Sequence, residues 1–330
     1  MQLISGFMGA QYVHVAAKLG LADRLSAGPR TAEELAAECG ADARALYRLL
    51  RALASLGVFA EVEGGRFELT ELAAPLRTDR DDSLGAIARM YGEEWFFRPY
   101  GALYHSVMTG QTAFEHVYGT GFYDYLAKSP EAARVFDDAM SGFTESHARR
   151  IVKEYDFGRF GRIMDVGGNR GTLLLAVLRA FPGTRGVLFD RSEVVAGLAT
   201  QLGDIEAELG PSRFEPCAGD FMLQVPAGCD AYIVRNVLQD WDDARAERLL
   251  TNCRKAMART GTLLVIGRLI EPGNTPYPGK FTDLTMMVLT GGRERTLAEL
   301  RELFLRAGLV LGGVTRTSAL VAIVEATPVA

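Results

Sequence analysis

The residues with the most evident chemical role form one short glycine-rich segment, Asp165-Val-Gly-Gly-Asn-Arg-Gly171. The segment joins a predicted strand at 162–166 to a predicted helix at 172–181. Glycines in such a connection let the backbone approach a ligand at the N-terminus of the helix. We therefore expect a small molecule to bind here. The expected binding residues are Asp165, Gly167, Gly168 and Asn169.

The spacing of these glycines separates two kinds of cofactor. The dinucleotide pattern G-x-G-x-x-G needs glycine at 167, 169 and 172, but two of these positions hold Asn169 and Thr172. The pattern acidic-x-G-x-G-x-G departs only at Asn169, an amino acid that adopts left-handed backbone angles more readily than most. Because this second pattern is typical of S-adenosylmethionine enzymes, it favours that cofactor over a nicotinamide.

A carboxylate ends the next predicted strand, at 186–190. An ionised Asp190 can accept hydrogen bonds from both hydroxyls of a ribose, and the end of the second strand is where such a group is expected. The alternative is an aspartate that is simply solvated at the end of its strand. Its place after the glycine segment favours a ribose-binding role.

Length and composition are those of a globular protein of about two domains. The 330 residues are 48% hydrophobic and 23% charged, and the formal net charge is −5, so no overall positive field would attract nucleic acid or an anionic membrane. The four cysteines form no C-x-x-C pair, so we expect no metal site and a reducing, cytoplasmic setting. No apolar run reaches roughly 18 residues and the N-terminus lacks a signal-peptide pattern. The expected partner is a small molecule.

Hydrophobic periodicity divides the chain into three predicted parts, at 1–80, 81–155 and 156–330. In the first, a capping-box spacing at Thr31 and helical leucine spacing over 41–56 predict helices, and alternation around Gly64-Gly65 predicts a hairpin. This order indicates a winged-helix domain. Nine Lys or Arg against ten Asp or Glu in residues 1–80 argue against DNA binding and favour dimerisation.

The start of the chain carries an apolar stripe at helical spacing. A stripe of this kind needs a partner surface, so we expect it to hold two copies of the chain together. The residues of the stripe are Ile4, Phe7, Met8, Tyr12, Val15 and Ala16.

From about residue 156 the pattern alternates between strands and helices. Strands are predicted at 162–166, 186–190, 230–235 and 262–266, with a helix at 243–257. Such alternation predicts an α/β domain with a mainly parallel sheet and a ligand at the carboxyl ends of the strands. The segment 81–155, helical and rich in aromatic residues, is predicted to be a linker and substrate lid.

Over nearly its whole length the chain resembles the S-adenosylmethionine-dependent O-methyltransferases that act on plant phenolics and bacterial polyketides. Besides DVGGNRG, the resemblance rests on AFEHVYG at 113–119, GDFMLQVPAGCDAY at 219–232, VRNVLQDWDD at 234–243 and GGRERT at 291–296. It implies a homodimer formed through an N-terminal all-helical winged-helix domain, a helical lid, and a Rossmann-like class I methyltransferase domain. It also implies secondary metabolism, such as antibiotic biosynthesis, as the setting.

The resemblance also implies roles for individual residues. Gly167 would face the methionine part of the cofactor and Asp190 its ribose. Asp220 and Phe221 would contact the adenine, and Arg235 would take the place of a basic residue that contacts the cofactor. The substrate wall would comprise Phe136, Met140, Met286 and Met287, although each of these residues can equally be read as core.

The chain departs from the family in its catalytic segment. Members of the family usually carry a histidine base in the segment that reads VLQDW here, and this chain has Gln239, which cannot act as a base. Of the two glutamates that brace this histidine in the family, one position is Gly267 and the other is Glu294. Gln239, Asp240 and Glu294 are therefore the candidate catalytic residues. The alternative bases are His105, His116 and His147, more simply read as ordinary helix residues.

Three interpretations of these departures remain open. General-base catalysis contributes about 10²–10⁴ in rate, whereas positioning two reactants supplies roughly 7–11 kcal/mol, so methyl transfer can proceed by proximity without the histidine. The resemblance also allows a cofactor-binding enzyme that has lost methyl transfer and catalyses cyclisation, rearrangement or hydroxylation. In that case Gln239 would donate a hydrogen bond to a substrate carbonyl, and the positive sulfur of the cofactor or Arg170 would polarise the reactant. The third interpretation is a non-catalytic dimer that binds a metabolite.

Overall fold

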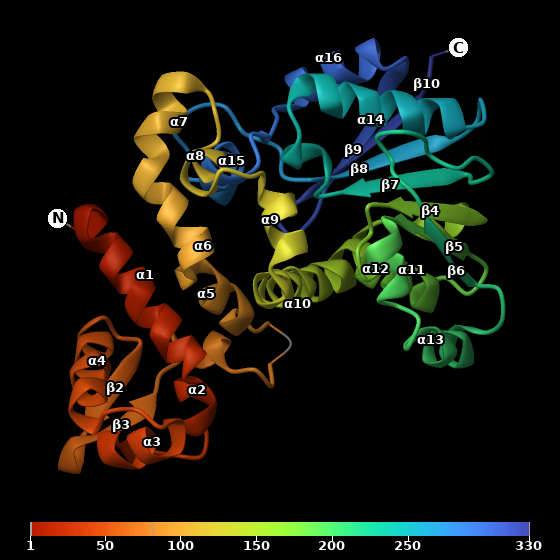
Figure 1. The fold of residues 1–330 in the computed structure, drawn as a ribbon. Helices are drawn as coiled ribbons and strands as arrows, with labels where there is room; N and C mark the ends of the chain where they lie inside the picture. Colours follow the sequence, from red (N-terminus) through yellow and green to blue (C-terminus); the bar gives the residue numbers. More distant parts are fainter. Residues whose placement is uncertain (1, 81, 330) are drawn as a thin grey trace. The chain divides into compact units, whose positions relative to one another are not determined.

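The computed structural model describes residues 2–80 and 82–329, without the side chains of residues 2 and 141–146. The chain forms two compact units, one of Met1–Gly101 with Tyr123–Ser146 and the other of Ala102–Phe122 with His147–Ala330. It passes from one unit to the other within η3 (Arg98–Ala102), α9 (Phe122–Lys128) and α10 (Pro130–Glu154) (Figure 1). The domain boundaries near residues 80 and 155 stay predictions.

The first unit consists of short helices and a small sheet. Its further elements are α1 (Gln2–Lys18), α2 (Leu21–Arg24), β1 (Arg30–Thr31), α3 (Ala32–Cys39), α4 (Ala43–Ser55), β2 (Phe59–Val62), η1 (Glu63–Gly65), β3 (Arg66–Leu69), η2 (Ala74–Leu76), α5 (Gly85–Gly92) and α6 (Glu94–Phe97). The predicted hairpin is confirmed, because β2 and β3 pair antiparallel, and β1 completes a three-stranded sheet in the order β1-β3-β2. The wing of the winged helix is this hairpin.

The capping box predicted at Thr31 is also confirmed. The side-chain oxygen of Thr31 accepts the N–H of Glu34 at 3.2 Å, and the N–H of Thr31 donates to the Glu34 carboxylate at 2.9 Å. Because these bonds satisfy two backbone donors that a helix start leaves open, α3 begins at a defined residue. Its buried Leu35 then packs with Leu50, Leu53 and Phe67 in the core of this unit.

Helix α1 divides its apolar residues between this core and the surface. Ala16 is buried in the core of its own unit and Tyr12 packs against that core, so these two residues of the predicted stripe have partners within the chain. The side of α1 that stays exposed carries Leu3, Ile4, Phe7, Met8 and Val15. The surface open to a second copy is therefore narrower than the sequence predicts, and it includes Leu3.

The second unit is built around a seven-stranded sheet. Its elements are α7 (Leu103–Thr109), α8 (Ala113–Tyr118), η4 (Phe157–Arg159), β4 (Arg162–Val166), α11 (Thr172–Ala180), β5 (Arg185–Asp190), α12 (Ser192–Ala196), α13 (Leu202–Leu209), β6 (Phe214–Ala218), β7 (Ala231–Arg235), η5 (Leu238–Asp240), α14 (Asp243–Ala256), β8 (Thr262–Gly267), α15 (Pro278–Leu289), α16 (Leu297–Arg306), β9 (Leu309–Arg316) and β10 (Ala322–Pro328). The four predicted strands are β4, β5, β7 and β8. Strands β6, β9 and β10 were not predicted.

The strand order places a ligand site beside β4. The sheet has the order β6-β5-β4-β7-β8-β10-β9, with β4 to β8 parallel and β10 antiparallel to both β8 and β9. The chain proceeds outward from β4 in one direction through β5 and β6, and then returns to build the other side from β7. In open sheets of this type ligands bind at such a reversal, outside the carboxyl ends of the strands.

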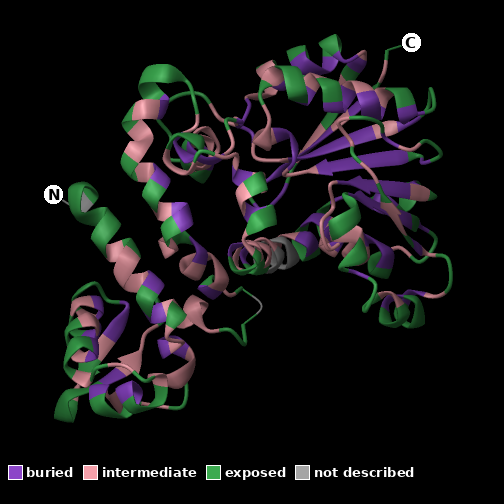
Figure 2. Cartoon of the chain, in the orientation of Figure 1, coloured by how far each residue is buried: buried purple, intermediate pink, exposed green. Residues whose placement is uncertain are grey.

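Two hydrophobic cores cover the two faces of the sheet. Successive strand residues alternate between them: Met164, Tyr232 and Val234 pack with α14 and α16, whereas Ile163 and Ile233 pack with α10 and α11. Figure 1 shows α14 and α16 on one side of the sheet and α11 on the other, and Figure 2 shows the central strands buried. Because both faces are covered, the strands present polar groups to a ligand only at their ends.

No helix in the described part of the chain is long and apolar enough to cross a membrane.

Candidate functional site

The glycine-rich loop follows β4 directly and turns by means of three left-handed residues. Gly167, Asn169 and Gly171 have φ values of 72°, 52° and 71°. Asparagine is among the few non-glycine residues that adopt this conformation at low cost, so Asn169 preserves the turn that glycine would make. The N–H of Gly167 donates to the carbonyl of Phe189 at 2.8 Å, which attaches the loop to β5.

Close packing accounts for the glycines at 167 and 168. A Cβ at Gly168 would lie 2.5 Å from Leu188 Cδ1 and 2.7 Å from a carboxylate oxygen of Asp165. At Gly167 it would lie 2.8 Å from Val237. The loop backbone therefore sits directly on the sheet edge, where its N–H groups can reach a ligand.

Asp190 holds this loop in place. One of its carboxylate oxygens accepts the N–H of Asn169 at 2.8 Å, and the other accepts the N–H of Arg191 at 2.7 Å. Each carboxylate oxygen can accept a second hydrogen bond, so Asp190 can still bind a pair of ribose hydroxyls. The sequence did not reveal the bond to Asn169, which joins two predicted cofactor residues.

Phe221 lies beside the same loop. Its ring is 3.5 Å from the Cβ position at Gly167 and 6.3 Å, between centroids, from Trp241. Its carbonyl accepts a hydrogen bond from Asn252 at 2.9 Å. Asp220 is exposed and accepts the N–H of Met222 at 2.7 Å. A flat ring such as adenine can therefore stack on Phe221 while Asp220 remains open to its edge.

Two ionisable residues lie close to the loop, the buried Asp165 and the half-buried Arg235. Burial raises the pKa of Asp165 to about 7, the charge of Arg235 opposes this rise, and Asp190 adds to it. Burial likewise lowers the pKa of Arg235 to about 10. Among the described residues, Nε and one Nη of Arg235 have no hydrogen-bond partner. Such donors suit an anionic group of a ligand, for example a carboxylate.

The segment after β7 brings Gln239 to a cavity at the ends of β7 and β8. Asn236 has a φ of 52°, after which η5 carries Gln239 to a position where Nε2 lies 3.9 Å from the Met286 sulfur. A Cβ at Gly267 would lie 3.8 Å from both Gln239 Oε1 and Asn236 Oδ1, which is ordinary contact distance, so no neighbour crowds this position. The cavity is lined in part by Asn236, Gln239, Gly267, Arg268 and Glu294.

Glu294 is the carboxylate of this cavity. It is 5% exposed, and its Oε1 has no hydrogen-bond partner in the described part of the chain. Its N–H donates to Asp283 at 2.8 Å. Burial raises the pKa of Glu294 to about 8, Arg268 and Arg295 oppose the rise, and Asp240 and Asp283 add to it. The structure thus brings together Gln239 and Glu294, two of the predicted catalytic residues, while Asp240 acts on Glu294 through its charge.

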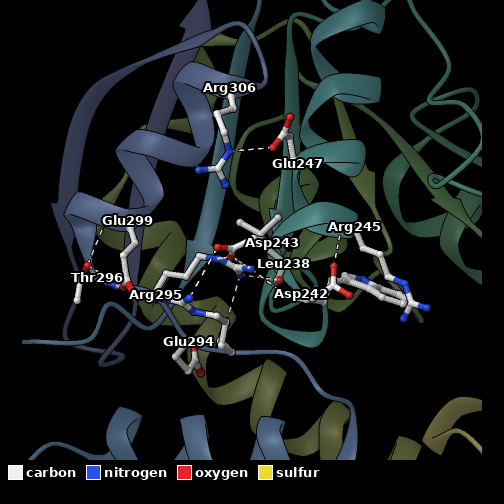
Figure 3. A network of polar contacts seen from close by, with 12 residues as sticks. Leu238, Asp242, Asp243, Arg245, Glu247, Glu294, Arg295, Thr296, Glu299 and Arg306 are labelled. Atoms are coloured by element: carbon white, nitrogen blue, oxygen red, sulfur yellow. Dashed lines mark hydrogen bonds and ion pairs between the residues drawn. The ribbon is translucent and has the colours of Figure 1, made fainter. Parts of the chain in front are cut away.

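Arg295 holds the Gln239 segment in position (Figure 3). Its guanidinium donates to the carbonyls of Leu238 at 3.0 Å and Trp241 at 2.9 Å, and to the Asp243 carboxylate at 2.8 and 3.0 Å. Arg295 is 5% exposed, so these bonds replace water for both carbonyls. The sequence contained Arg295 within GGRERT but gave no sign of its partners.

Gly292 allows the loop before α16 to lie close to the segment that carries Gln239. A Cβ at this position would lie 2.1 Å from the carbonyl oxygen of Gln239 and 2.4 Å from the carbonyl carbon of Asp240. A backbone clash of this size cannot be relieved by a rotamer change. The loop that carries Glu294 therefore packs directly on the backbone of the Gln239 segment.

The predicted substrate wall is distributed over both units. Met286 and Met287 lie on α15, are half-buried, and belong to the same unit as Gln239. Phe136 and Met140 lie on α10 within the first unit and are also half-buried. A place for Phe136 and Met140 at the site stays a prediction.

The three candidate histidine bases differ in their surroundings. His105 and His116 stack on each other at 4.0 Å between ring centroids, and His116 is exposed. Burial, together with the positive charges of Arg235, Arg268 and Arg150, lowers the pKa of His147 to about 4. At neutral pH His147 is therefore uncharged and a weak base. Among the described residues, no cluster of three or more His, Cys, Asp or Glu is placed to hold a metal ion.

Two family models match this chain. An O-methyltransferase domain matches residues 100–310, and an O-methyltransferase dimerisation domain matches residues 1–79. The chain is 44% identical over 329 residues to phenazine O-methyltransferase PhzM of Lysobacter antibioticus, covering 100% of this chain and 95% of the relative.

Solved structures agree with these matches. The structure of LaPhzM superposes with a TM-score of 0.92 at 45% identity, covering 99% of this chain and 97% of the other. NcsB1 from neocarzinostatin biosynthesis, in complex with S-adenosylmethionine and 2-hydroxy-5-methyl naphthoic acid, gives a TM-score of 0.83 at 35% identity, covering 97% and 96%. The chain therefore belongs to the O-methyltransferase family with an N-terminal dimerisation domain, and it is an S-adenosylmethionine-dependent methyltransferase with a class I fold.

The contacts of Arg295 predict a large and specific loss of stability. Arg295→Met removes the donors that bind the Trp241 carbonyl and the Asp243 carboxylate, and leaves the Leu238 carbonyl with only the long bond from the Trp241 N–H at 3.4 Å. It is expected to lower the free energy of unfolding by about 3 kcal/mol. Urea denaturation measures the change. The matched control is Arg306→Met, which removes an exposed ion pair with Glu247 and is expected to cost less than about 1 kcal/mol. Equal losses in the two variants would contradict the role given to Arg295.

Proposed function

We propose that this enzyme transfers a methyl group from S-adenosylmethionine to the hydroxyl of a polycyclic aromatic secondary metabolite, such as a phenazine or a naphthoate. The observation that carries the proposal is the loop tied to Asp190 lying at the same sheet edge as the cavity of Gln239 and Glu294. The two relatives described above support the acceptor class, because one is named for phenazine and the other holds a naphthoic acid. The expected setting is antibiotic or related biosynthesis in the cytoplasm.

We assign the residues along the sheet edge to different parts of the cofactor. We assign the backbone of Gly167, Gly168 and Asn169 to the methionine part, with Asp165 holding the loop from below. Asp190 receives the ribose hydroxyls, and Phe221 with Asp220 receives the adenine. The unpartnered donors of Arg235 suit the carboxylate of the methionine part. When bound, the cofactor supplies an electrophilic methyl group on a sulfonium.

Gln239 orients the acceptor. Its side-chain amide can donate to an acceptor oxygen and accept a hydroxyl hydrogen, and the bond that its Nε2 makes to the Met286 sulfur is long, at 3.9 Å. Arg295 binds the carbonyls on either side of Gln239, and Gly292 packs against the Gln239 backbone. The Gln239 side chain therefore extends from a fixed backbone position. Positioning of this kind can supply roughly 7–11 kcal/mol of the barrier. We therefore assign methyl transfer mainly to proximity, without a histidine base.

The two other interpretations from the sequence are outcomes of one experiment. The enzyme is incubated with S-adenosylmethionine and a panel of hydroxylated phenazines and naphthoates, and the products are analysed by mass spectrometry. Methyl transfer to oxygen gives a product heavier by one methyl group, located by fragmentation. Isomeric, cyclised or hydroxylated products without a methyl group would instead indicate repurposed chemistry. Cofactor binding with no product from the panel would favour the non-catalytic dimer.

The role of Asp190 predicts a loss of cofactor affinity. Asp190→Ala removes the expected ribose bonds and the bond to Asn169, so the Kd for S-adenosylmethionine is expected to rise at least about tenfold, since each charge-assisted bond is worth about 1.5–3 kcal/mol. Isothermal titration calorimetry measures the Kd. Asp204→Ala, an exposed carboxylate on α13, is the control and is expected to bind normally. An unchanged Kd in Asp190→Ala would remove Asp190 from the cofactor site.

The role of Gln239 predicts a moderate loss of turnover. Gln239→Ala removes one or two hydrogen bonds to the acceptor and is expected to lower kcat about 10–100-fold. The exposed Gln224→Ala serves as the control. Gln239→His restores the residue common in the family and is expected to raise methylation, though Gly267 leaves the new imidazole without one brace. Full activity in Gln239→Ala would show that the reaction centre lies elsewhere.

The exposed side of α1 predicts the oligomeric state. The match to a dimerisation domain implies a homodimer, and we propose that Leu3, Ile4, Phe7 and Met8 contribute to its interface. Phe7→Glu is expected to give a monomer at micromolar concentration in light scattering, because it places a charge in an apolar contact. Leu72→Glu, an exposed leucine elsewhere in the first unit, is expected to remain dimeric. A dimeric Phe7→Glu would move the interface away from α1. No nucleic acid or membrane partner is expected.

A further inference from the structure

The cavity beside Gln239 contains a carboxyl group that the proposed function does not yet use. Glu294 is 5% exposed and lines the cavity together with Asn236, Gln239 and Gly267. Its Oε1 is buried and has no hydrogen-bond partner among the described residues, and the same is true of Asn236 Oδ1. A buried polar atom without a partner costs about 1–3 kcal/mol, so its retention needs a reason.

Residue 267 lines the cavity beside Gln239 and, as a glycine, adds no side chain to it. At Gly267 the nearest atoms to a Cβ are the side-chain oxygens of Asn236 and Gln239, both at 3.8 Å, which is ordinary contact distance. Glu294 lines the same cavity as Gly267 and Gln239. With glycine there, an acceptor hydroxyl or one bridging water can reach Glu294.

The charged groups that act on Glu294 come from several different elements. Arg268 follows β8, Asp240 ends η5, Asp283 lies on α15, and Arg295 is the next residue in the chain. Tyr277, just before α15, also lies within the electrostatic reach of Glu294. Burial outweighs the two arginines, and the pKa of Glu294 is raised to about 8. A carboxylate with a raised pKa is a stronger base than an ordinary one and is ionised in part near neutral pH.

We propose that Glu294 is the general base of this enzyme, accepting at Oε1 the proton of the acceptor hydroxyl in place of the absent histidine. The proposal rests on the proposed function. The O–H bond of the acceptor breaks and its proton passes to Oε1, directly or through one water. The oxygen keeps the electron pair and forms the bond to the methyl carbon, while the pair of the broken C–S bond stays on sulfur. Glu294 then releases the proton to solvent.

The proposal separates acceptors by the acidity of their hydroxyl. A simple phenol has a pKa of about 10 and stays protonated near pH 8, so its methylation depends on Glu294. A phenol that is already ionised at neutral pH has no proton to lose. Loss of the Glu294 carboxylate therefore affects the first acceptor far more than the second.

The experiment compares the wild-type enzyme and Glu294→Gln on two acceptors over a range of pH. The acceptors are a hydroxynaphthoate and its dinitro derivative, whose hydroxyl is ionised. On the hydroxynaphthoate, wild-type kcat/KM is expected to rise with pH and level off near 8, the pKa of Glu294. Glu294→Gln is expected to remove this limb and to lower kcat/KM about 10²–10⁴-fold at pH 8. The loss on the dinitro acceptor is expected to be at least tenfold smaller.

Two further variants test whether the carboxylate itself is responsible. Glu294→Asp keeps a carboxylate at a shorter reach, so it is expected to keep the pH limb with a lower plateau. Glu302→Gln removes an exposed carboxylate on α16 and is expected to leave the pH profile unchanged. Equal losses on both acceptors in Glu294→Gln, with the limb retained, would show a structural role and overturn the proposal.

Thermal unfolding provides a readout that needs no acceptor. An unfolded glutamate loses its proton near pH 4.5, whereas folded Glu294 keeps it to about 8. Over this window the unfolded state binds fewer protons than the folded state, so wild-type stability falls with rising pH through this group. The Tm of Glu294→Gln minus that of the wild type is therefore expected to increase from pH 5 to 8 and then level off. A constant difference would overturn the titration assigned to Glu294.

Failure of the proposed function and failure of the general-base role give different results in these experiments. A wild-type enzyme that binds S-adenosylmethionine but methylates neither acceptor at any pH would contradict methyl transfer itself, and the general-base role would fall with it. Methylation of both acceptors with no differential effect of Glu294→Gln would overturn the general base alone.

Discussion

The buried guanidinium of Arg295 is the interaction on which the catalytic part of the site depends. Arg295 joins the loop before α16 to the segment after β7 by donating to Leu238, Trp241 and Asp243. These residues lie more than fifty positions away from Arg295 in the sequence. Because the bonds are to backbone carbonyls as well as to a side chain, they fix the path of the chain through Gln239. The backbone of Glu294, the preceding residue, is held by a separate bond from its N–H to Asp283.

A second interaction, the hydrogen bonding of Asp190, fixes the chain in the cofactor part of the site. Asp190 bonds the N–H of Asn169, so the glycine-rich loop and the end of β5 form one rigid edge. The parallel strands β4, β5 and β7 end side by side at this edge. Their order explains why a cofactor residue after β5 and a catalytic residue after β7 can serve one reaction.

The sequence predicted the elements that local pattern determines. The strands at β4, β5, β7 and β8 are continuous apolar runs because both faces of the sheet are covered, and Asn169 could be recognised as a left-handed turn residue. Strand β6 escaped prediction because Pro216 interrupts it, as an edge strand allows, and β9 because Gly312 and Gly313 weaken its pattern. The partners of Arg295 and the close approach at Gly292 depend on tertiary packing, which no local pattern reports.

The central claim is that the acceptor hydroxyl reacts beside Gln239 and Glu294. A crystal structure with S-adenosylhomocysteine and a hydroxynaphthoate acceptor tests it most directly. We predict that the hydroxyl oxygen lies within hydrogen-bonding distance of the Gln239 side chain and reaches Glu294 directly or through one water. A hydroxyl directed instead at His105, His116 or His147, with the cavity of Glu294 closed to the acceptor, would contradict the account.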